Sequence, residues 1–156
     1  MSEFVWTEAM SVGVPALDAD HRCLVRIINL LHDAEGNDTN RVIDTVMEAL
    51  NRYARFHFAR EEQVMLACGF PALGVHRAEH AGFSRMLESI PQRPRGETAA
   101  RELLDYLKDW LLHHILIQDM AYKPYIAESS DLDEITTTIA ALLPPIEVAS
   151  LIGETA

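Results

Sequence analysis

The stretch HFAREEQVMLACGFPALGVHRAEH, residues 57–80, decides the fold of this chain. Its apolar residues keep a helical spacing on both sides of a short break at Gly69 and Pro71. Glycine commonly ends a helix, and proline often follows because it cannot continue one. The stretch therefore predicts two long helices that are joined by a tight turn and run in opposite directions.

Two pairs of polar side chains lie within this predicted hairpin. His57 and Glu61 are four residues apart on the first helix, and His76 and His80 are four residues apart on the second. Residues at this spacing lie one turn apart on the same helix face. Each pair shares its face with apolar residues, and a buried imidazole or carboxylate without a partner is costly. A metal ion between the helices would remove that cost, although either pair alone is also common on a solvated surface.

The rest of the chain continues the helical pattern outward from the hairpin. We predict four long helices and one short C-terminal helix, with Asp18 as the N-cap of the first and Pro124 ending the fourth. Their expected ranges are 18–34, 41–67, 73–89, 97–122 and 131–143. Long helices with short connections are typical of an all-α, antiparallel up-down-up-down four-helix bundle. Residues 1–17 are expected to form an ordered N-terminal arm, since Phe4, Val5 and Trp6 need a surface to pack on.

The 156 residues suit one bundle domain, residues 1–126, followed by an acidic extension, residues 127–156. No basic residue follows Lys123. The short helix predicted in the extension has an apolar face that could pack on its own bundle or on a protein partner. A monomer is expected, because one bundle accounts for the apolar faces.

Charge and composition exclude several functions. The formal net charge of −11 argues against binding to nucleic acid and to anionic membranes, because both need clustered basic residues. No run approaches the roughly 20 apolar residues of a membrane span. The N-terminus lacks the pattern of a signal peptide. Cys23 and Cys68 are far apart and are expected to be free thiols in a reducing compartment, so a cytoplasmic location is expected.

A third pair of side chains on one helix and a single histidine complete the set of candidate metal ligands. His21 lies in the first predicted helix, and His114 and Asp119 lie in the fourth. A lone histidine on an apolar face is usually a hydrogen-bonded core residue, but contributions from all four helices favour a metal. A structural zinc ion usually takes four ligands, often thiolates. Seven histidine and carboxylate candidates fit two iron ions better.

These motifs resemble those of bacterial hemerythrins from about Phe4 to Ile126. The matching segments are WTEAMSVGVPALDADH (Trp6–His21), HFAREE (His57–Glu62), GFPALGVHRAEH (Gly69–His80) and WLLHHILIQDMAY (Trp110–Tyr122). The resemblance implies reversible binding of dioxygen at a non-haem di-iron centre with an oxo or hydroxo bridge.

The resemblance also implies a role for each ligand. One iron ion would be held by His76, His80 and His114, and the other, with an open position for dioxygen, by His21 and His57. Glu61 and Asp119 would bridge the two ions. The residues that match the family's apolar wall around the oxygen pocket are Leu24, Phe58, Trp110, Leu111 and Ile115, and Met65 is expected to join them.

The spacing of His114 and Asp119 does not fit a regular α-helix. Five residues turn the chain about 140° away from the starting face. A local π-bulge would bring Asp119 back towards His114, and such bulges are often found at functional sites. We therefore predict an interruption of the i→i−4 hydrogen bonds between residues 114 and 119.

Two other functions remain open at this level. The acidic extension is compatible with a sensor of oxygen, nitric oxide or redox state that acts through a protein partner. A di-iron oxidase or peroxidase is disfavoured, because ferritin-like di-iron proteins use Glu-x-x-His pairs and carboxylate-rich sites. The sequence predicts binding of dioxygen rather than enzymatic turnover, and no catalytic residue is assigned.

Overall fold

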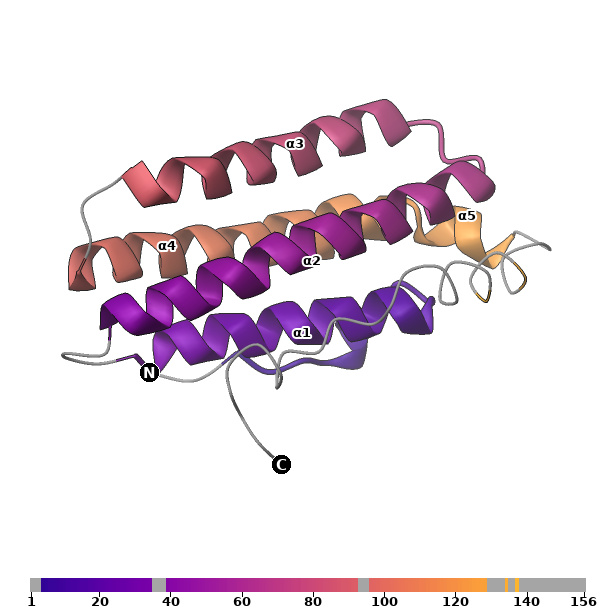
Figure 1. Cartoon of the computed structure of the whole chain (residues 1–156). Coiled ribbons are helices and arrows are strands. Elements are labelled where there is room, and N and C mark those ends of the chain that lie inside the picture. The colour runs from indigo at the N-terminus through magenta and orange to yellow at the C-terminus, as the bar shows by residue number, and fades with distance from the viewer. Residues whose placement is uncertain (1–3, 35–38, 93–95, 129–133, 135–136, 138–156) are drawn as a thin grey trace.

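The chain folds into an antiparallel bundle of four long helices in a computed structural model (Figure 1). The structure describes residues 4–34, 39–92, 96–128, 134 and 137, and this part of the chain contains no strand. The helices are α1 (Pro15–His32), α2 (Thr39–Ala67), α3 (Leu73–Ser89), α4 (Glu97–Trp110) and the short α5 (Lys123–Ala127). A π-helical segment (Leu111–Gln118) and a 3-10 turn (Asp119–Ala121) continue α4. The predicted fold class is confirmed.

The start of the first helix and the role of Pro124 differ from the prediction, although the helical run that begins with α4 ends at Ala121, close to the predicted residue 122. Helix α1 begins at Pro15, because proline's fixed φ suits the first helical turn, and Asp18 lies inside the helix rather than at its N-cap. The buried Asp18 carboxylate instead accepts hydrogen bonds from the backbone N–H of Val12 (2.9 Å) and the hydroxyl of Ser11 (2.6 Å). Pro124 does not end a helix but lies in the first turn of α5. The helix predicted at 131–143 lies outside the described residues, apart from Glu134 and Thr137.

The N-terminal arm packs along the bundle, as predicted, but not through all three of its apolar residues. The backbone N–H of Phe4 donates to the side chain of Asn29 (2.9 Å), which donates back to the Phe4 carbonyl (2.8 Å). The Trp6 ring lies under the guanidinium of Arg22 at 4.9 Å. Val5 remains 68% exposed, so its predicted burial is wrong.

The apolar core is divided into two clusters along the bundle. The larger includes Ile27 and Leu50, and the smaller includes Leu17 and Tyr122. On each of the four long helices, counting the π-helical continuation of α4, at least one buried histidine or carboxylate lies between residues of the two clusters. A layer of polar side chains therefore lies between the two apolar clusters.

The two cysteines are free thiols in the structure. Cys23 is buried in the larger cluster, and burial raises the pKa of its thiol to about 12. Cys68 is half-buried near the end of α2. Because the thiolate is the reactive form, the Cys23 thiol is inert at neutral pH.

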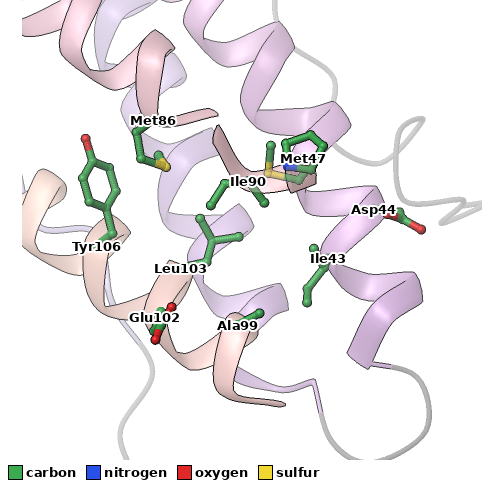
Figure 2. A pocket seen from close by; sticks show the side chains of 10 residues that line it. Ile43, Asp44, Met47, Met86, Ile90, Ala99, Glu102, Leu103 and Tyr106 are labelled. Atoms are coloured by element: carbon green, nitrogen blue, oxygen red, sulfur yellow. The ribbon is translucent and has the colours of Figure 1, made fainter. Parts of the chain in front are cut away.

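A cavity of about 220 Å³ lies near the opposite end of the bundle from α5, between α2, the end of α3 and the start of α4 (Figure 2). Its apolar wall includes Met47, Met86 and Leu103. Met47 precedes His57 by ten residues, which corresponds to about 15 Å along a helix. The cavity is therefore separate from the polar layer. No helix in the described part of the chain is long and apolar enough to cross a membrane.

Candidate metal centre

All seven predicted ligands meet in the polar layer, and each is at most 3% exposed. They form two groups, in each of which the candidate ligand atoms lie within 4.8 Å of one another. One group contains Glu61, His76, His80 and His114, and the other contains His21, His57, Glu61 and Asp119. The grouping of the histidines is the one that the sequence resemblance implies.

Glu61 lies between the two groups and directs one oxygen to each. Its Oε1 atom is 2.7 Å from His76 Nε2 and 2.9 Å from His80 Nε2. Its Oε2 atom is 3.2 Å from His57 Nε2 and 3.7 Å from His21 Nε2. A carboxylate in this position is suited to bridge two cations.

Asp119 is divided between the groups in the same way. Its Oδ1 atom lies 3.1 Å from the Nε2 atoms of both His76 and His114. Its Oδ2 atom lies 3.1 Å from His21 Nε2. Both oxygens are buried, yet neither makes a hydrogen bond of acceptable geometry within the described part of the chain. Buried polar atoms without a hydrogen bond are rare in native proteins, and an ion bound between these oxygens would satisfy them.

The spacing of the donor atoms fits a coordination shell. The Nε2 atoms of His21 and His57 are 3.2 Å apart, as are those of His80 and His114. Metal–nitrogen bonds of about 2.1 Å at right angles separate neighbouring donors by about 3.0 Å. The imidazoles therefore converge on common points, as ligands of a cation do, and the donor set fits a binuclear metal site.

The π-helical segment Leu111–Gln118 brings Asp119 into the site. Hydrogen bonds of the i→i+5 type widen each turn, so five residues turn the chain by little more than one full turn. His114 and Asp119 consequently face the same way, with His114 Nε2 and Asp119 Oδ1 3.1 Å apart. The predicted interruption of the α-helical hydrogen bonds is confirmed.

Aromatic rings stack on three of the histidines. Phe58 lies over His80 with ring centroids 3.9 Å apart, and Trp110 lies over His114 at 4.1 Å. Tyr53 covers His57 at 4.8 Å. These stacked rings restrict rotation of the imidazoles and keep water from one side of the site.

The predicted pocket residues lie on both sides of the polar layer. Those fully buried in the larger core cluster are Leu24, Leu111 and Ile115. Met65 is also fully buried but belongs to the smaller cluster, one turn beyond Glu61. Met65 is thus on the opposite side of the polar layer from the other predicted lining residues.

Three residues at the site were not assigned a role from the sequence, and two of them, Tyr122 and Asp20, contact a proposed ligand. Tyr122 is fully buried, and its hydroxyl donates to Glu61 Oε2 (3.0 Å). Asp20 and Arg60 form a buried ion pair beside His57, with Arg60 Nη2 2.6 Å from Asp20 Oδ1. Arg60 follows His57 by three residues, so helical spacing could have indicated that they share a face.

Two histidines lie outside the site. His32 is the last residue of α1 and contacts Asp33, with Nδ1 3.2 Å from Oδ1. His113 is exposed on the π-helical segment. Glu62, next to Glu61, contacts the exposed Arg77 at 3.5 Å and lies 3.7 Å from His80 Nδ1.

The carboxylates strongly shift the titration of the metal-free site. Burial lowers the pKa of His21, but Asp119 and Glu61 outweigh it and raise this pKa to about 10. The same balance raises the pKa values of His76 and His114 to about 9. Burial raises the pKa of Glu61, but the neighbouring histidines hold it well below its ordinary value. At pH 7 the metal-free site therefore contains protonated imidazoles beside ionised carboxylates.

Metal binding should release protons at neutral pH. His21, His76 and His114 must lose their protons before Nε2 can bind a cation, so we expect release of up to about three protons per chain. Because their pKa values are raised, metal affinity should increase with pH from about 6 to about 10. Calorimetric titration in two buffers with different ionisation enthalpies measures the release. Identical apparent enthalpies in both buffers would contradict the expected protonation.

The fold and the site together define a four-helix-bundle protein with a binuclear metal site of histidines and carboxylates. Residues 12–126 match the family model described as "Hemerythrin HHE cation binding domain". The chain therefore belongs to the hemerythrin family.

Several curated relatives cover most of the chain. It is 33% identical over 130 residues to a bacteriohemerythrin of Pseudomonas paraeruginosa, covering 83% of this chain and 85% of the relative. It is 31% identical to a bacteriohemerythrin of Stenotrophomonas maltophilia, with 78% and 80% covered. For a bacteriohemerythrin of Clostridium acetobutylicum, the identity is 30%, with 76% and 98% covered.

Proposed function

We propose that this protein binds dioxygen reversibly at a pair of iron ions and serves as a carrier or store. The observation that supports this proposal best is the arrangement of Glu61 and Asp119. Each carboxylate directs one of its oxygens to one group of histidines and its other oxygen to the other group. Two shared carboxylates suit two ions held close together. The family match and the similarity to bacteriohemerythrins give the same indication.

The proposed ligands divide unequally between the two ions. His76, His80 and His114 would hold one ion, and His21 and His57 would hold the other, with Glu61 and Asp119 shared. The ion with fewer protein ligands would then keep a position for dioxygen. Imidazole and carboxylate ligands suit iron. When bound, the iron pair supplies the two electrons that reversible binding of dioxygen requires.

The surrounding side chains favour binding over turnover. Buried Leu24, Leu111 and Ile115 exclude water from the larger-cluster side of the site. The stacked rings of Phe58 and Trp110 hold His80 and His114 in place. A dry and rigid wall limits the supply of protons to the bound ligand. We therefore propose a binding protein that is not an enzyme.

The test is to purify the protein, count its iron, reduce it without oxygen and record its visible spectrum. We expect about two irons per chain and a new absorption that appears with air and disappears when oxygen is removed. The air-exposed metal-free protein is the control for scattering and for protein oxidation. Immediate, irreversible oxidation would contradict reversible binding, and failure to bind two irons would contradict the proposed centre.

A further inference from the structure

A buried ion pair of Asp20 and Arg60 lies against His57 at one side of the proposed metal centre. Asp20 precedes the proposed ligand His21 on α1, but its side chain faces α2. Its Oδ2 atom accepts hydrogen bonds from His57 Nδ1 (3.0 Å) and Arg60 Nε (2.8 Å). Its Oδ1 atom accepts a second bond from Arg60 at Nη2 (2.6 Å). Asp20 and Arg60 are 3% and 2% exposed, so both charges lie in the protein interior.

This contact fixes the orientation of His57. A carboxylate accepts hydrogen bonds, so the proton on the imidazole lies at Nδ1 and the lone pair at Nε2. Nε2 points into the centre, 3.2 Å from both Glu61 Oε2 and His21 Nε2. Carboxylates that accept from the outer nitrogen of a metal-bound histidine orient the ring and increase its basicity.

The arrangement is asymmetric across the centre. The Nδ1 atoms of His21, His80 and His114 are buried, and none has a hydrogen-bond partner in the described part of the chain. Glu62 lies 3.7 Å from His80 Nδ1, beyond hydrogen-bond distance, and its side chain is 26% exposed. His57 therefore differs from these three imidazoles in having a buried carboxylate hydrogen-bonded to its Nδ1 atom. Arg60 opposes that charge from the other side of Asp20, through two hydrogen bonds.

We propose that Asp20 and Arg60 are positioning residues that orient His57 and set, through opposing charges, the reduction potential of the metal centre. This inference rests on the proposed iron site. The negative charge of Asp20 stabilises the more oxidised, more positive state of the metal, and the positive charge of Arg60 disfavours it. Removing the charge of Asp20 should therefore raise the reduction potential, and removing the charge of Arg60 should lower it.

The first experiment is an anaerobic redox titration of the iron-loaded protein, followed by its visible spectrum. Asp20→Asn keeps an oxygen that can accept from His57 but removes the charge, so we expect a higher midpoint potential. Arg60→Gln should lower the potential, whereas Arg60→Lys keeps the charge and should remain near wild type. Arg52→Gln is the matched control, because Arg52 also lies on α2 but is exposed.

A second measurement does not depend on redox behaviour. Asp20→Ala removes the hydrogen bond to His57 as well as the charge, and loss of such a partner typically weakens metal binding 10- to 100-fold. Competition between the metal-free variant and a chelator for iron(II) measures this loss. We expect a smaller loss for Asp20→Asn, and none for the exposed control Asp109→Asn.

The double variant Asp20→Asn/Arg60→Gln keeps the test decisive if Arg60→Gln alone does not fold. Its potential should lie below that of Asp20→Asn, because the opposing charge has also been removed. Equal potentials for these two variants, or shifts of the same sign for both single variants, would overturn the inference. So would unchanged affinity in Asp20→Ala. Wild-type protein without two irons would instead overturn the proposed function.

Discussion

Replacing Glu61 with alanine is expected to reduce the bound metal from two ions per chain to at most one. Glu61 Oε1 lies 2.7 Å from His76 Nε2, and Oε2 lies 3.2 Å from His57 Nε2. The substitution therefore removes one proposed ligand atom from beside each group of histidines. It also leaves the hydroxyl of Tyr122 without its acceptor in the fully buried interior. Metal analysis of the purified, anaerobically loaded variant measures the loss.

The same helix offers a matched control. Glu48 lies on α2 but is exposed, so Glu48→Ala removes the same charge without affecting the centre. It should retain about two ions per chain. Two ions bound to Glu61→Ala with wild-type affinity would show that Glu61 does not bridge the centre.

Removing the metal is expected to lower the melting temperature of the protein substantially. In the metal-free state, five imidazoles and two carboxylates remain buried together. An ion that binds only the folded state adds about 4 kcal/mol at a free concentration a thousand times its Kd. For a chain of this size, that corresponds to about 8–16 °C per ion. Two ions should therefore raise the melting temperature by more than either alone.

Differential scanning calorimetry of the metal-free and iron-loaded protein under anaerobic conditions measures this difference. Glu61→Ala provides the comparison, because a variant that holds fewer ions should show a smaller increase on loading. A change of less than about 2 °C in wild type, at saturating metal, would contradict a centre that is coupled to folding.

The convergence of the proposed ligands could be predicted from the sequence because their spacing and their apolar surroundings are local features. His57 with Glu61 and His76 with His80 lie on single helix faces, and a helical prediction alone brings each pair together. The position of Asp119 was harder to predict, because a regular α-helix directs its side chain away from His114. Its position depends on the π-helical segment, which the conflict in spacing indicated.

Residues that act through tertiary contacts were missed. Arg60 and Asp20 are charged residues of a kind that is usually solvated, so no sequence rule predicts that they pair in the interior. Tyr122 lies beyond the regular part of α4, where the chain passes from a 3-10 turn into α5. Pro124 was predicted to end the fourth helix, but it lies in the first turn of α5. Proline can follow one helix and begin another, because its fixed φ suits the first helical turn.

The division of the apolar interior into two clusters has a consequence for how the molecule opens. The smaller cluster joins residues of the N-terminal arm, such as Val12, to Ile126 of α5. The larger cluster includes most of the buried apolar residues of α1 and α4. Metal ions bound to side chains from all four long helices would join the two clusters into one cooperative unit. Without the metal ions, we expect the backbone amides around the smaller cluster to exchange their hydrogens through a partial unfolding that leaves the larger cluster folded.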